Sequence, residues 1–287
     1  MTVVSGRPFV GLLLACHLGP TIVVTVVSSL LAWATSRDVA ITALVAGAVL
    51  AGQLSIGWSN DANDAAVDRR AGRDDKPIVS GEVTRSTVWV AAVVALTVAT
   101  VLSFAAAGLL GGAAHVVAVL SAWVYNLRLS RTAWSFLPYM VSFGLLPVFI
   151  VAAAPGRTRP AAWAVAAFVL VAAGAHLANG LKDADSDRAV GLGGTVQHLG
   201  ERAARRWAGA AFTAATVAIG VGARGAALPL AVGSPTLAFV TLVVPLWAAP
   251  TAWRFRIVLV AALLIVIVLV VATLTGQVTI VAASVPR

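Results

Sequence analysis

Two short stretches of the sequence carry the residue types best suited to chemistry. Each has an asparagine followed by aspartates at helical spacing: Asn60, Asp61, Asp64 and Asp68 in the first, and Asn179, Asp183 and Asp187 in the second. At 100° per residue, this spacing gathers the side chains on one face of a helix. Oxygen ligands without histidine or thiolate partners suit Mg²⁺ better than zinc. Two such clusters facing each other would hold metal ions whose remaining ligands are the oxygens of a diphosphate.

The two stretches also match each other at a constant offset of 119 residues. Eight identities fall without a gap in a window of 23 residues, and their first copies are Asn60, Asp64, Ala65, Asp68, Arg69, Gly72, Gly81 and Glu82. The match predicts duplication of a four-helix unit, with halves at about 9–127 and 134–248. Internal repeats of membrane proteins commonly place the ligand site where the repeats meet.

Basic residues accompany both clusters. They are Arg69, Arg73 and Lys76 after the first, Lys182 and Arg188 around the second, and Arg128 and Arg131 between the halves. Such side chains can neutralise phosphate oxygens and stabilise a departing diphosphate. A role in topology or in contacts with lipid headgroups is the alternative for Arg69, Arg70, Arg188, Arg205 and Arg206. Asp185 lies off the main face and fits an ion pair with Lys182 or Arg188 better than a ligand role.

The composition places these stretches in a membrane protein. Of the 287 residues 60% are hydrophobic and 11% are charged, and a spanning helix needs about 20 mostly apolar residues. We therefore expect one all-α polytopic domain over residues 1–287, around a central cavity that opens to the cytoplasmic side. Its nine predicted spans lie at about 9–34, 39–58, 86–107, 109–127, 134–154, 161–181, 205–223, 226–248 and 257–284, with Gly111-Gly112 separating the third from the fourth.

The net charge of +9 is explained by topology. Fifteen of the twenty Lys and Arg fall in one set of loops, which the positive-inside rule predicts to be cytoplasmic, with the N-terminus inside. Ten of the eleven Asp and Glu lie on the same side. We therefore expect membrane lipids, and no nucleic acid, as partners. The abundance of Ala, Val and Arg favours a bacterial plasma membrane.

Cysteine and histidine offer little further chemistry. Cys16, the only cysteine, excludes an internal disulfide and a cysteine-based zinc site. The apolar run after Pro8 is too long for a cleavable signal and is expected to form the first span. Membrane histidines such as His17 and His115 usually make interhelical hydrogen bonds. His176, one turn before Asn179, is the histidine expected to face the acids and is a candidate for the acceptor site.

The ordered motifs resemble those of the UbiA-type intramembrane prenyltransferases. Asn60-Asp61-x-x-Asp64-x-x-x-Asp68 is similar to the first signature of that family, and Asp183-x-x-x-Asp187 to the second. The segments 73-RDDKPIVSGEVT-84 and 125-YNLRLSR-131 resemble the loops that follow the first motif and precede the fifth span. The resemblance covers almost the whole chain.

This resemblance implies residue roles. Asn60, Asp61, Asp64 and Asp68 would serve one Mg²⁺, and Asp183 and Asp187 a second, so the aspartates would be catalytic. The diphosphate contacts would be Asn60, Arg69, Lys76, Tyr125, Arg128, Asn179 and Lys182. Two departures weaken single assignments: Gly180 stands where many members have an acid, and Leu129 stands where a base is usual, so that Arg128 or Arg131 must substitute.

The resemblance implies transfer of an isoprenyl group from a prenyl diphosphate to a small acceptor, such as an aromatic compound or a quinone precursor. Mg²⁺ and the bases would promote ionisation of the allylic C–O bond in a dry, aromatic-walled cavity. A membrane terpene cyclase, which needs no acceptor, is the alternative on the same scaffold. A non-catalytic prenyl-lipid carrier or a cation transporter is the alternative from another class, although transport favours charges at the bilayer midplane.

Overall fold

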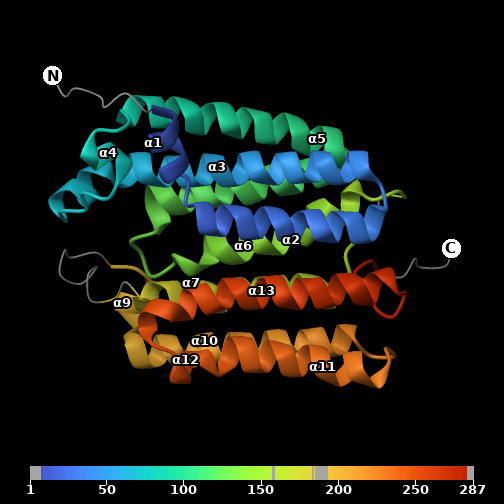
Figure 1. Ribbon diagram of the computed structural model, residues 1–287. Helices are drawn as coiled ribbons and strands as arrows, with labels where there is room; N and C mark the ends of the chain where they lie inside the picture. The colour runs from blue at the N-terminus through green and yellow to red at the C-terminus, as the bar shows by residue number, and fades with distance from the viewer. Residues whose placement is uncertain (1–7, 157–158, 183, 185–192, 283–287) are drawn as a thin grey trace.

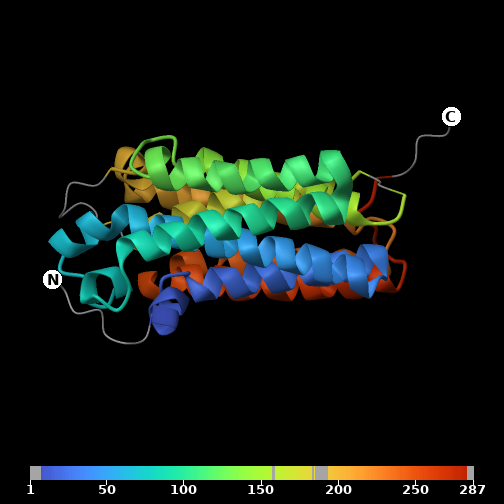
Figure 2. The same ribbon diagram turned by 90° about the horizontal axis from the view of Figure 1, so that it is seen from above.

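The computed structural model describes residues 8–156, 159–182, 184 and 193–282. In these residues the chain forms long helices that run side by side along one axis (Figures 1 and 2). The helices are α1 (Pro8–Leu14), α2 (Leu18–Ser36), α3 (Val39–Arg70), α4 (Pro77–Ser80), α5 (Arg85–Val124), α6 (Phe136–Ala153), α7 (Ala162–Lys182), α9 (Thr195–Leu199), α10 (Glu201–Gly222), α11 (Leu228–Ala238), α12 (Pro245–Ala248) and α13 (Thr251–Leu274), with π-helical turns η1 (Tyr125–Leu129) and η2 (Phe239–Val243).

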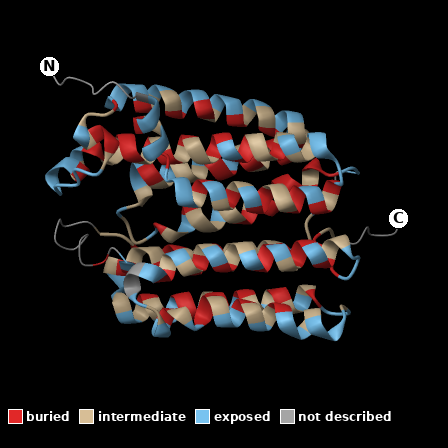
Figure 3. Cartoon of the chain, in the orientation of Figure 1, coloured by how far each residue is buried: buried red, intermediate tan, exposed pale blue. Residues whose placement is uncertain are grey.

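The membrane fold predicted from the sequence is confirmed in its class. Among the described residues, seven helical segments are long and apolar enough to cross a membrane: Leu18–Ser36, Val39–Arg70, Arg85–Leu129, Phe136–Ala153, Ala162–Lys182, Leu228–Ala248 and Trp253–Leu274. Large apolar side chains such as Val90 and Leu110 are exposed on the outside of the bundle (Figure 3). A soluble protein seldom exposes so much apolar surface, whereas lipid tails would cover it.

Helix α5 is two antiparallel arms rather than one straight helix. Gly108 has φ 63° and ψ −162°, a conformation that interrupts the helix and is accessible mainly to glycine. Ser103 and His115 would lie about 18 Å apart on a straight helix, yet Ser103 Oγ is 2.7 Å from His115 Nδ1. The predicted spans 86–107 and 109–127 therefore exist as separate arms. The break expected at Gly111-Gly112 was wrong in position, because Gly108 makes the turn while Gly111 and Gly112 let the arms pack closely.

The first predicted span, 9–34, was wrong as one helix. The chain breaks between α1 and α2, where His17 adopts the left-handed conformation (φ 53°, ψ 58°). A Cβ on Gly57 of α3 would lie 2.5 Å from the carbonyl oxygen of Cys16, so only glycine allows this approach. Cys16 is buried, as expected of a small core residue. Periodicity alone gives no sign of such a break, since apolar residues continue through it.

The ends of the later spans also differ from the expectation. Helix α10 begins at Glu201 rather than at residue 205, because its first turns carry charged residues that a hydropathy criterion omits. The predicted span 226–248 contains Pro235 and Pro245 and becomes α11, η2 and α12. The span expected at 257–284 is α13, which begins earlier, at Thr251, and ends earlier, at Leu274. Val281, after α13, forms an isolated bridge with Pro160, which precedes α7.

Two apolar clusters hold the bundle together. One joins α2, α3, α6 and the start of α7, around Phe149 and Ile150. The other joins α7, α10, α12 and α13, around Phe212 and Leu246. Helices α3 and α7 end, and α10 and α13 begin, at the same end of the bundle (Figures 1 and 2). This end, which also holds α4 and α9, is called the motif end below.

Candidate active site

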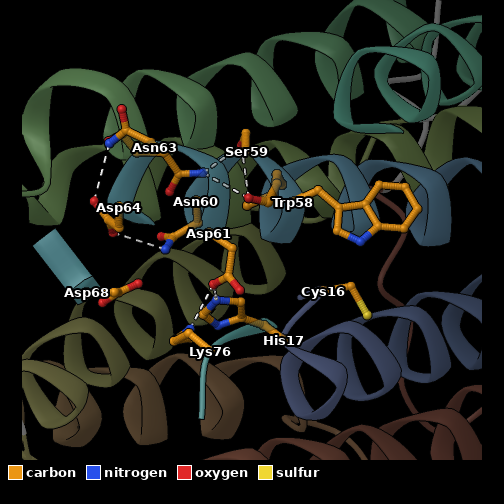
Figure 4. A network of polar contacts seen from close by, with 12 residues as sticks. Cys16, His17, Trp58, Ser59, Asn60, Asp61, Asn63, Asp64, Asp68 and Lys76 are labelled. Carbon is orange, nitrogen blue, oxygen red and sulfur yellow. Dashed lines mark hydrogen bonds and ion pairs between the residues drawn. The ribbon is translucent and has the colours of Figure 1, made fainter. Parts of the chain in front are cut away.

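The first acidic motif lies on the last turns of α3, which continues as a helix to Arg70. This confirms that residues 58–70 extend the second predicted span. Asp61 and Asp68 are buried, whereas Asn60 and Asp64 are half-buried and joined by a hydrogen bond of 3.2 Å from Asn60 Nδ2 to Asp64 Oδ2. The spacing of three and four residues thus brings the four side chains to neighbouring positions on the helix, as Figure 4 shows.

Each of the three aspartates forms an ion pair with a different basic side chain. Lys76 Nζ lies 2.7 Å from Asp61 Oδ1, Arg73 Nη1 lies 3.2 Å from Asp68 Oδ1, and Arg131 Nη2 lies 2.9 Å from Asp64 Oδ1. These pairs offset the repulsion between carboxylates on adjacent turns. The acids are therefore compatible with burial at a membrane interface, where an unpaired charge would be costly.

The segment after α3 turns back on the helix to deliver Lys76. Gly72 and Gly81 have positive φ angles of 66° and 83°, so the chain reverses on both sides of α4 without steric strain. Pro77 occupies the first position of α4, where its missing N–H has no cost. The loop similar to that of the family thus carries a base to Asp61.

His17 is the second partner of Asp61. Its Nε2 lies 3.1 Å from Asp61 Oδ1, and Figure 4 shows the imidazole beside Lys76 at this carboxylate. Trp58 ties the same region together by donating a hydrogen bond of 2.8 Å from Nε1 to the carbonyl of Leu12. Sequence reasoning placed His17 inside a span and therefore missed this contact, which depends on the break between α1 and α2.

A second set of polar contacts joins α3 to the π-helical turn η1. Asn63 Nδ2 donates to the carbonyl oxygen of Asn126 at 2.9 Å, and Asn126 Nδ2 donates to Ser59 Oγ at 2.9 Å. The turn carries Arg131, two residues after its last residue, to Asp64. Neither asparagine was a candidate from the sequence, although Asn126 follows Tyr125 in the segment that resembles a family loop.

A cluster of aromatic rings joins η1, α6 and α7. The ring of Tyr139 lies 5.2 Å from that of Tyr125 and 4.7 Å from that of His176, measured between centroids. His176 is buried, and its Nε2 is 3.0 Å from Ser135 Oγ. Ser135 Oγ also accepts a hydrogen bond of 3.1 Å from the backbone N–H of Thr195. The described contacts of His176 are thus with Ser135, Tyr125 and Tyr139, and its orientation toward the acids stays a prediction.

An apolar cavity continues from these rings into the bundle. Its volume is about 130 Å³, and it is lined by side chains of α2, α6, α7, α10 and α13. Phe143 lines it one turn beyond Tyr139, and Ala175 lines it next to His176. Trp163, at the start of α7, lines it near the opposite end of the bundle. Along α6, Tyr139 therefore precedes the cavity-lining Phe143 from the motif end inward.

The remaining predicted bases and Asn179 differ in exposure. Arg69 and Arg128 are exposed, and no ion pair joins either one to another described residue. Asn179 is half-buried near the end of α7, and Lys182 is exposed at that end. Of the two bases offered for the loop, Arg131 rather than Arg128 therefore reaches an acid.

The second motif lies outside the described residues. This holds for Asp183 and Asp187, and for the flanking Asp185 and Arg188. Its described neighbours lie at the motif end, because α7 ends at Lys182 (Figure 1). A Cβ on Gly194 would lie 3.2 Å from the carbonyl oxygen of Ser130, so the chain returns beside the segment that holds Arg131.

The donor set of α3 fits Mg²⁺. Its carboxylates and amides supply oxygen atoms, the ligands that this ion prefers. Within the described ranges, no three His, Cys, Asp or Glu side chains come together as a metal site. Asp61, Asp64 and Asp68 would supply the first ligands, and Mg²⁺ commonly takes only one or two protein carboxylates.

A comparison with protein-family models decides the family. The UbiA prenyltransferase family model matches residues 21–258, which is most of the chain and includes the acids of α3. The chain belongs to the UbiA prenyltransferase family. It is therefore an enzyme of the prenyltransferase class. Among curated proteins, no sequence matches it.

Solved structures with the UbiA fold are similar over almost the whole chain. A UbiA homologue from Archaeoglobus fulgidus bound to GPP and Mg²⁺ has a TM-score of 0.74 at 13% identity, covering 92% of this chain and 99% of that one. An apo UbiA homologue from Aeropyrum pernix K1 has a TM-score of 0.69 at 20% identity, covering 88% and 97%. A digeranylgeranylglyceryl phosphate synthase has a TM-score of 0.69 at 15% identity, covering 94% and 99%. At these identities the likeness establishes the fold of this family member.

Proposed function

We propose that the enzyme transfers an isoprenyl group from a prenyl diphosphate to a small acceptor and releases diphosphate. The observation that carries the proposal is the row of acid–base pairs at the motif end of a bundle that encloses an apolar cavity. Lys76 and Arg131 each hold a carboxylate of α3 at less than 3 Å. The rings of Tyr125, Tyr139 and His176 form a cluster on η1, α6 and α7. Solved UbiA homologues bound to DMAPP and Mg²⁺ or to GPP and Mg²⁺ support the choice of donor.

The side chains at the motif end would bind and orient the diphosphate. Asp61, Asp64 and Asp68, with Asn60, would hold one Mg²⁺, and Asp183 and Asp187 a second. Lys76, Arg131 and Lys182 would contact the diphosphate oxygens, for which charge-assisted hydrogen bonds are strong. Bound Mg²⁺ neutralises the diphosphate and makes it a better leaving group. Tyr125, Asn179 and the exposed Arg69 and Arg128 would form the rim.

The apolar cavity would take the isoprenyl tail. Phe143 lines the cavity, and its ring stacks on that of Tyr139 with centroids 6.4 Å apart. The π faces of these two rings would stabilise an allylic cation and exclude water. Breaking the C–O bond leaves both electrons on the diphosphate oxygen, and a nucleophilic atom of the acceptor then bonds to the allylic carbon and loses its proton. His176, hydrogen-bonded to Ser135 beside both tyrosines, would lie next to the acceptor.

The same proposal includes the finer topology. The two arms of α5 and the charged helix α10, added to the other spanning segments, support nine passes made of two four-helix halves and a ninth helix. We place the motif end on the cytoplasmic side of a bacterial plasma membrane, with the N-terminus inside, because the basic residues gather in those loops.

The experiment is diphosphate release by the purified protein. Release from geranyl diphosphate should require Mg²⁺, stop with EDTA, and fall at least about a hundredfold in Asp64→Asn, since this carboxylate accepts three hydrogen bonds at the site. Asp75→Asn, an exposed acid at the same end, is the matched control and should retain activity. Full activity of Asp64→Asn would overturn the site.

Product analysis separates the alternatives. A transferase forms a prenylated product only when an acceptor is added, so mass spectrometry with and without a panel of aromatic acceptors distinguishes it from a cyclase. A cyclase would consume the donor alone and form a hydrocarbon or an alcohol. Donor recovered unchanged with Mg²⁺ and every acceptor would indicate a carrier.

A further inference from the structure

A pair of arginines at the motif end is not used by the reaction. Arg254, near the start of α13, is only 6% exposed, and its Nη1 is buried without a hydrogen-bond partner among the described residues. Arg205, in the second turn of α10, has a buried Nε in the same situation. Both residues adjoin α12: Ala204, next to Arg205, packs in one buried cluster with Leu246, and Arg254 is bonded to Ala249. Buried charges are normally paired, so these unpaired donors call for an anion.

The packing holds this pair in place from both sides. Ala204, Leu246 and Val258 belong to one buried cluster, so α10, α12 and α13 meet beside the two arginines. Arg254 Nε donates to the carbonyl of Ala249 at 3.1 Å, which fixes the guanidinium against the end of α12. The remaining donors of Arg254 are therefore positioned in advance rather than free to turn to solvent.

Two long helices, α10 and α13, begin at the motif end (Figures 1 and 2). Helix α10 has Gly200 and helix α13 has Pro250 at the N-cap, and neither N-cap supplies a side-chain hydrogen bond. The backbone N–H groups of a first helical turn carry partial positive charge and favour an anion. Segments 200–207 and 249–256 together contain five arginines and one acid, Glu201. Helix dipoles and side-chain charge therefore both favour a negative group here.

The surroundings point to a lipid rather than a soluble anion. Trp247 on α12 and Trp253 on α13, next to Arg254, are more than half exposed. Exposed tryptophans gather at the level of lipid headgroups. Arg256 stacks on Trp253, with its Cζ 5.2 Å from the ring centroid. Beyond this level α13 exposes apolar side chains such as Val260 and Leu264, against which acyl chains can lie.

We propose that Arg205 and Arg254, with the uncapped N-terminus of α13, bind the phosphate group of an anionic phospholipid. The guanidinium groups donate to the phosphate oxygens, and the tryptophans contact the glycerol and upper acyl region. Basic pockets between membrane helices bind anionic headgroups by this chemistry. The site lies on α10 and α13, apart from the acids of α3, and its occupancy does not depend on the prenyl donor.

The test compares lipids on the full-length purified protein. The thermal unfolding midpoint is measured in phosphatidylcholine nanodiscs with increasing phosphatidylglycerol, and separately with added inorganic phosphate. We expect a saturable rise with phosphatidylglycerol and none with phosphate, which lacks acyl chains. An equal effect of inorganic phosphate would overturn the lipid assignment, and no effect of either would overturn the site.

Variants locate the effect. Arg205→Gln and Arg254→Gln should each weaken the phosphatidylglycerol response at least about tenfold, as expected for the loss of a hydrogen bond to a charged group. Arg224→Gln, exposed at the other end of α10, removes the same charge and should change the response less than about twofold. Arg206→Gln is the closer control, because Arg206 lines a separate depression of about 890 Å³ that Arg205 does not line.

The sign of the stability change separates ligand binding from a structural role. In pure phosphatidylcholine, Arg254→Gln should unfold no earlier than the wild type, because it removes a buried charge without a partner. A variant that unfolds earlier in both lipids and keeps its phosphatidylglycerol response would show that Arg254 only supports packing. Arg205→Gln, at a half-buried position, keeps the test decisive if Arg254→Gln does not fold.

Discussion

Lys76 Nζ lies 2.7 Å from Oδ1 of Asp61, a carboxylate that is only 3% exposed. This ion pair links the last turns of α3 to the loop before α4. Breaking one side of a buried pair leaves a charge without a partner, at a cost of about 3 kcal/mol or more. The pair therefore supports both the fold of the motif end and the position of a proposed metal ligand.

A double-mutant cycle tests this link. Lys76→Met and Asp61→Asn should each lower the stability measured by chemical unfolding in detergent, and the double variant should lose less than the sum of the two. The expected coupling is about 1–3 kcal/mol, typical of residues in direct contact. Arg70→Met, exposed on the same helix, is the control and should couple to neither change. Strict additivity would contradict a native Lys76–Asp61 pair.

The two loop arginines should separate in kinetics. Arg131 reaches Asp64 at 2.9 Å, whereas Arg128 is exposed. We expect Arg131→Gln to raise KM for the prenyl diphosphate about tenfold, from the loss of one charge-assisted hydrogen bond. Arg128→Gln should change it less than about twofold. Steady-state kinetics with geranyl diphosphate measure both, and the reverse ranking would show that the substrate recruits Arg128 instead.

Motif spacing predicted the first half of the site because chemistry and helical geometry coincide there. A helix brings residues at i, i+4 and i, i+7 to one face, which is the spacing of Asn60, Asp61, Asp64 and Asp68. Their side chains are therefore neighbours however the helix packs in the bundle. Lys76 was predictable for a different reason: only a short loop separates it from the end of α3, so it must stay near the acids. The tail cavity was implied only through the family, because its lining comes from five helices far apart in sequence.

Contacts between distant elements were not predictable. His17 reaches Asp61 only because the chain breaks after α1, and that break depends on the close approach of Cys16 to Gly57. The turn at Gly108 was missed because Gly111 and Gly112 give the stronger local signal for a break. Arg254 looked like a loop residue, since its burial depends on α10 and α12 rather than on its own segment.

The approach of α2 to α3 gives a stability prediction with a matched control. A Cβ on Gly57 would lie 2.5 Å from the Cys16 carbonyl, so Gly57→Ala must push the break away from α3. We expect a loss of about 1–3 kcal/mol from overpacking and reduced activity, since His17 moves with Cys16. Gly19→Ala meets nothing within 4 Å and should be neutral or slightly stabilising. Thermal unfolding in detergent measures both, and equal stability would place the break elsewhere.

Neighbouring residues of α2 can test whether the apolar cavity takes the isoprenyl tail. Val27 lines the cavity, whereas Val26, one position earlier, is exposed on the outer face of the bundle. Val27→Trp fills a cavity of only about 130 Å³, so long tails should be excluded more strongly than short ones. We expect kcat/KM for geranylgeranyl diphosphate to fall at least about tenfold more than kcat/KM for dimethylallyl diphosphate, since each buried methylene contributes about 0.8 kcal/mol. Val26→Trp adds the same bulk toward lipid and should leave the ratio unchanged. If both variants lower the two rates equally, the tail lies outside the space between α2, α6, α7 and α13.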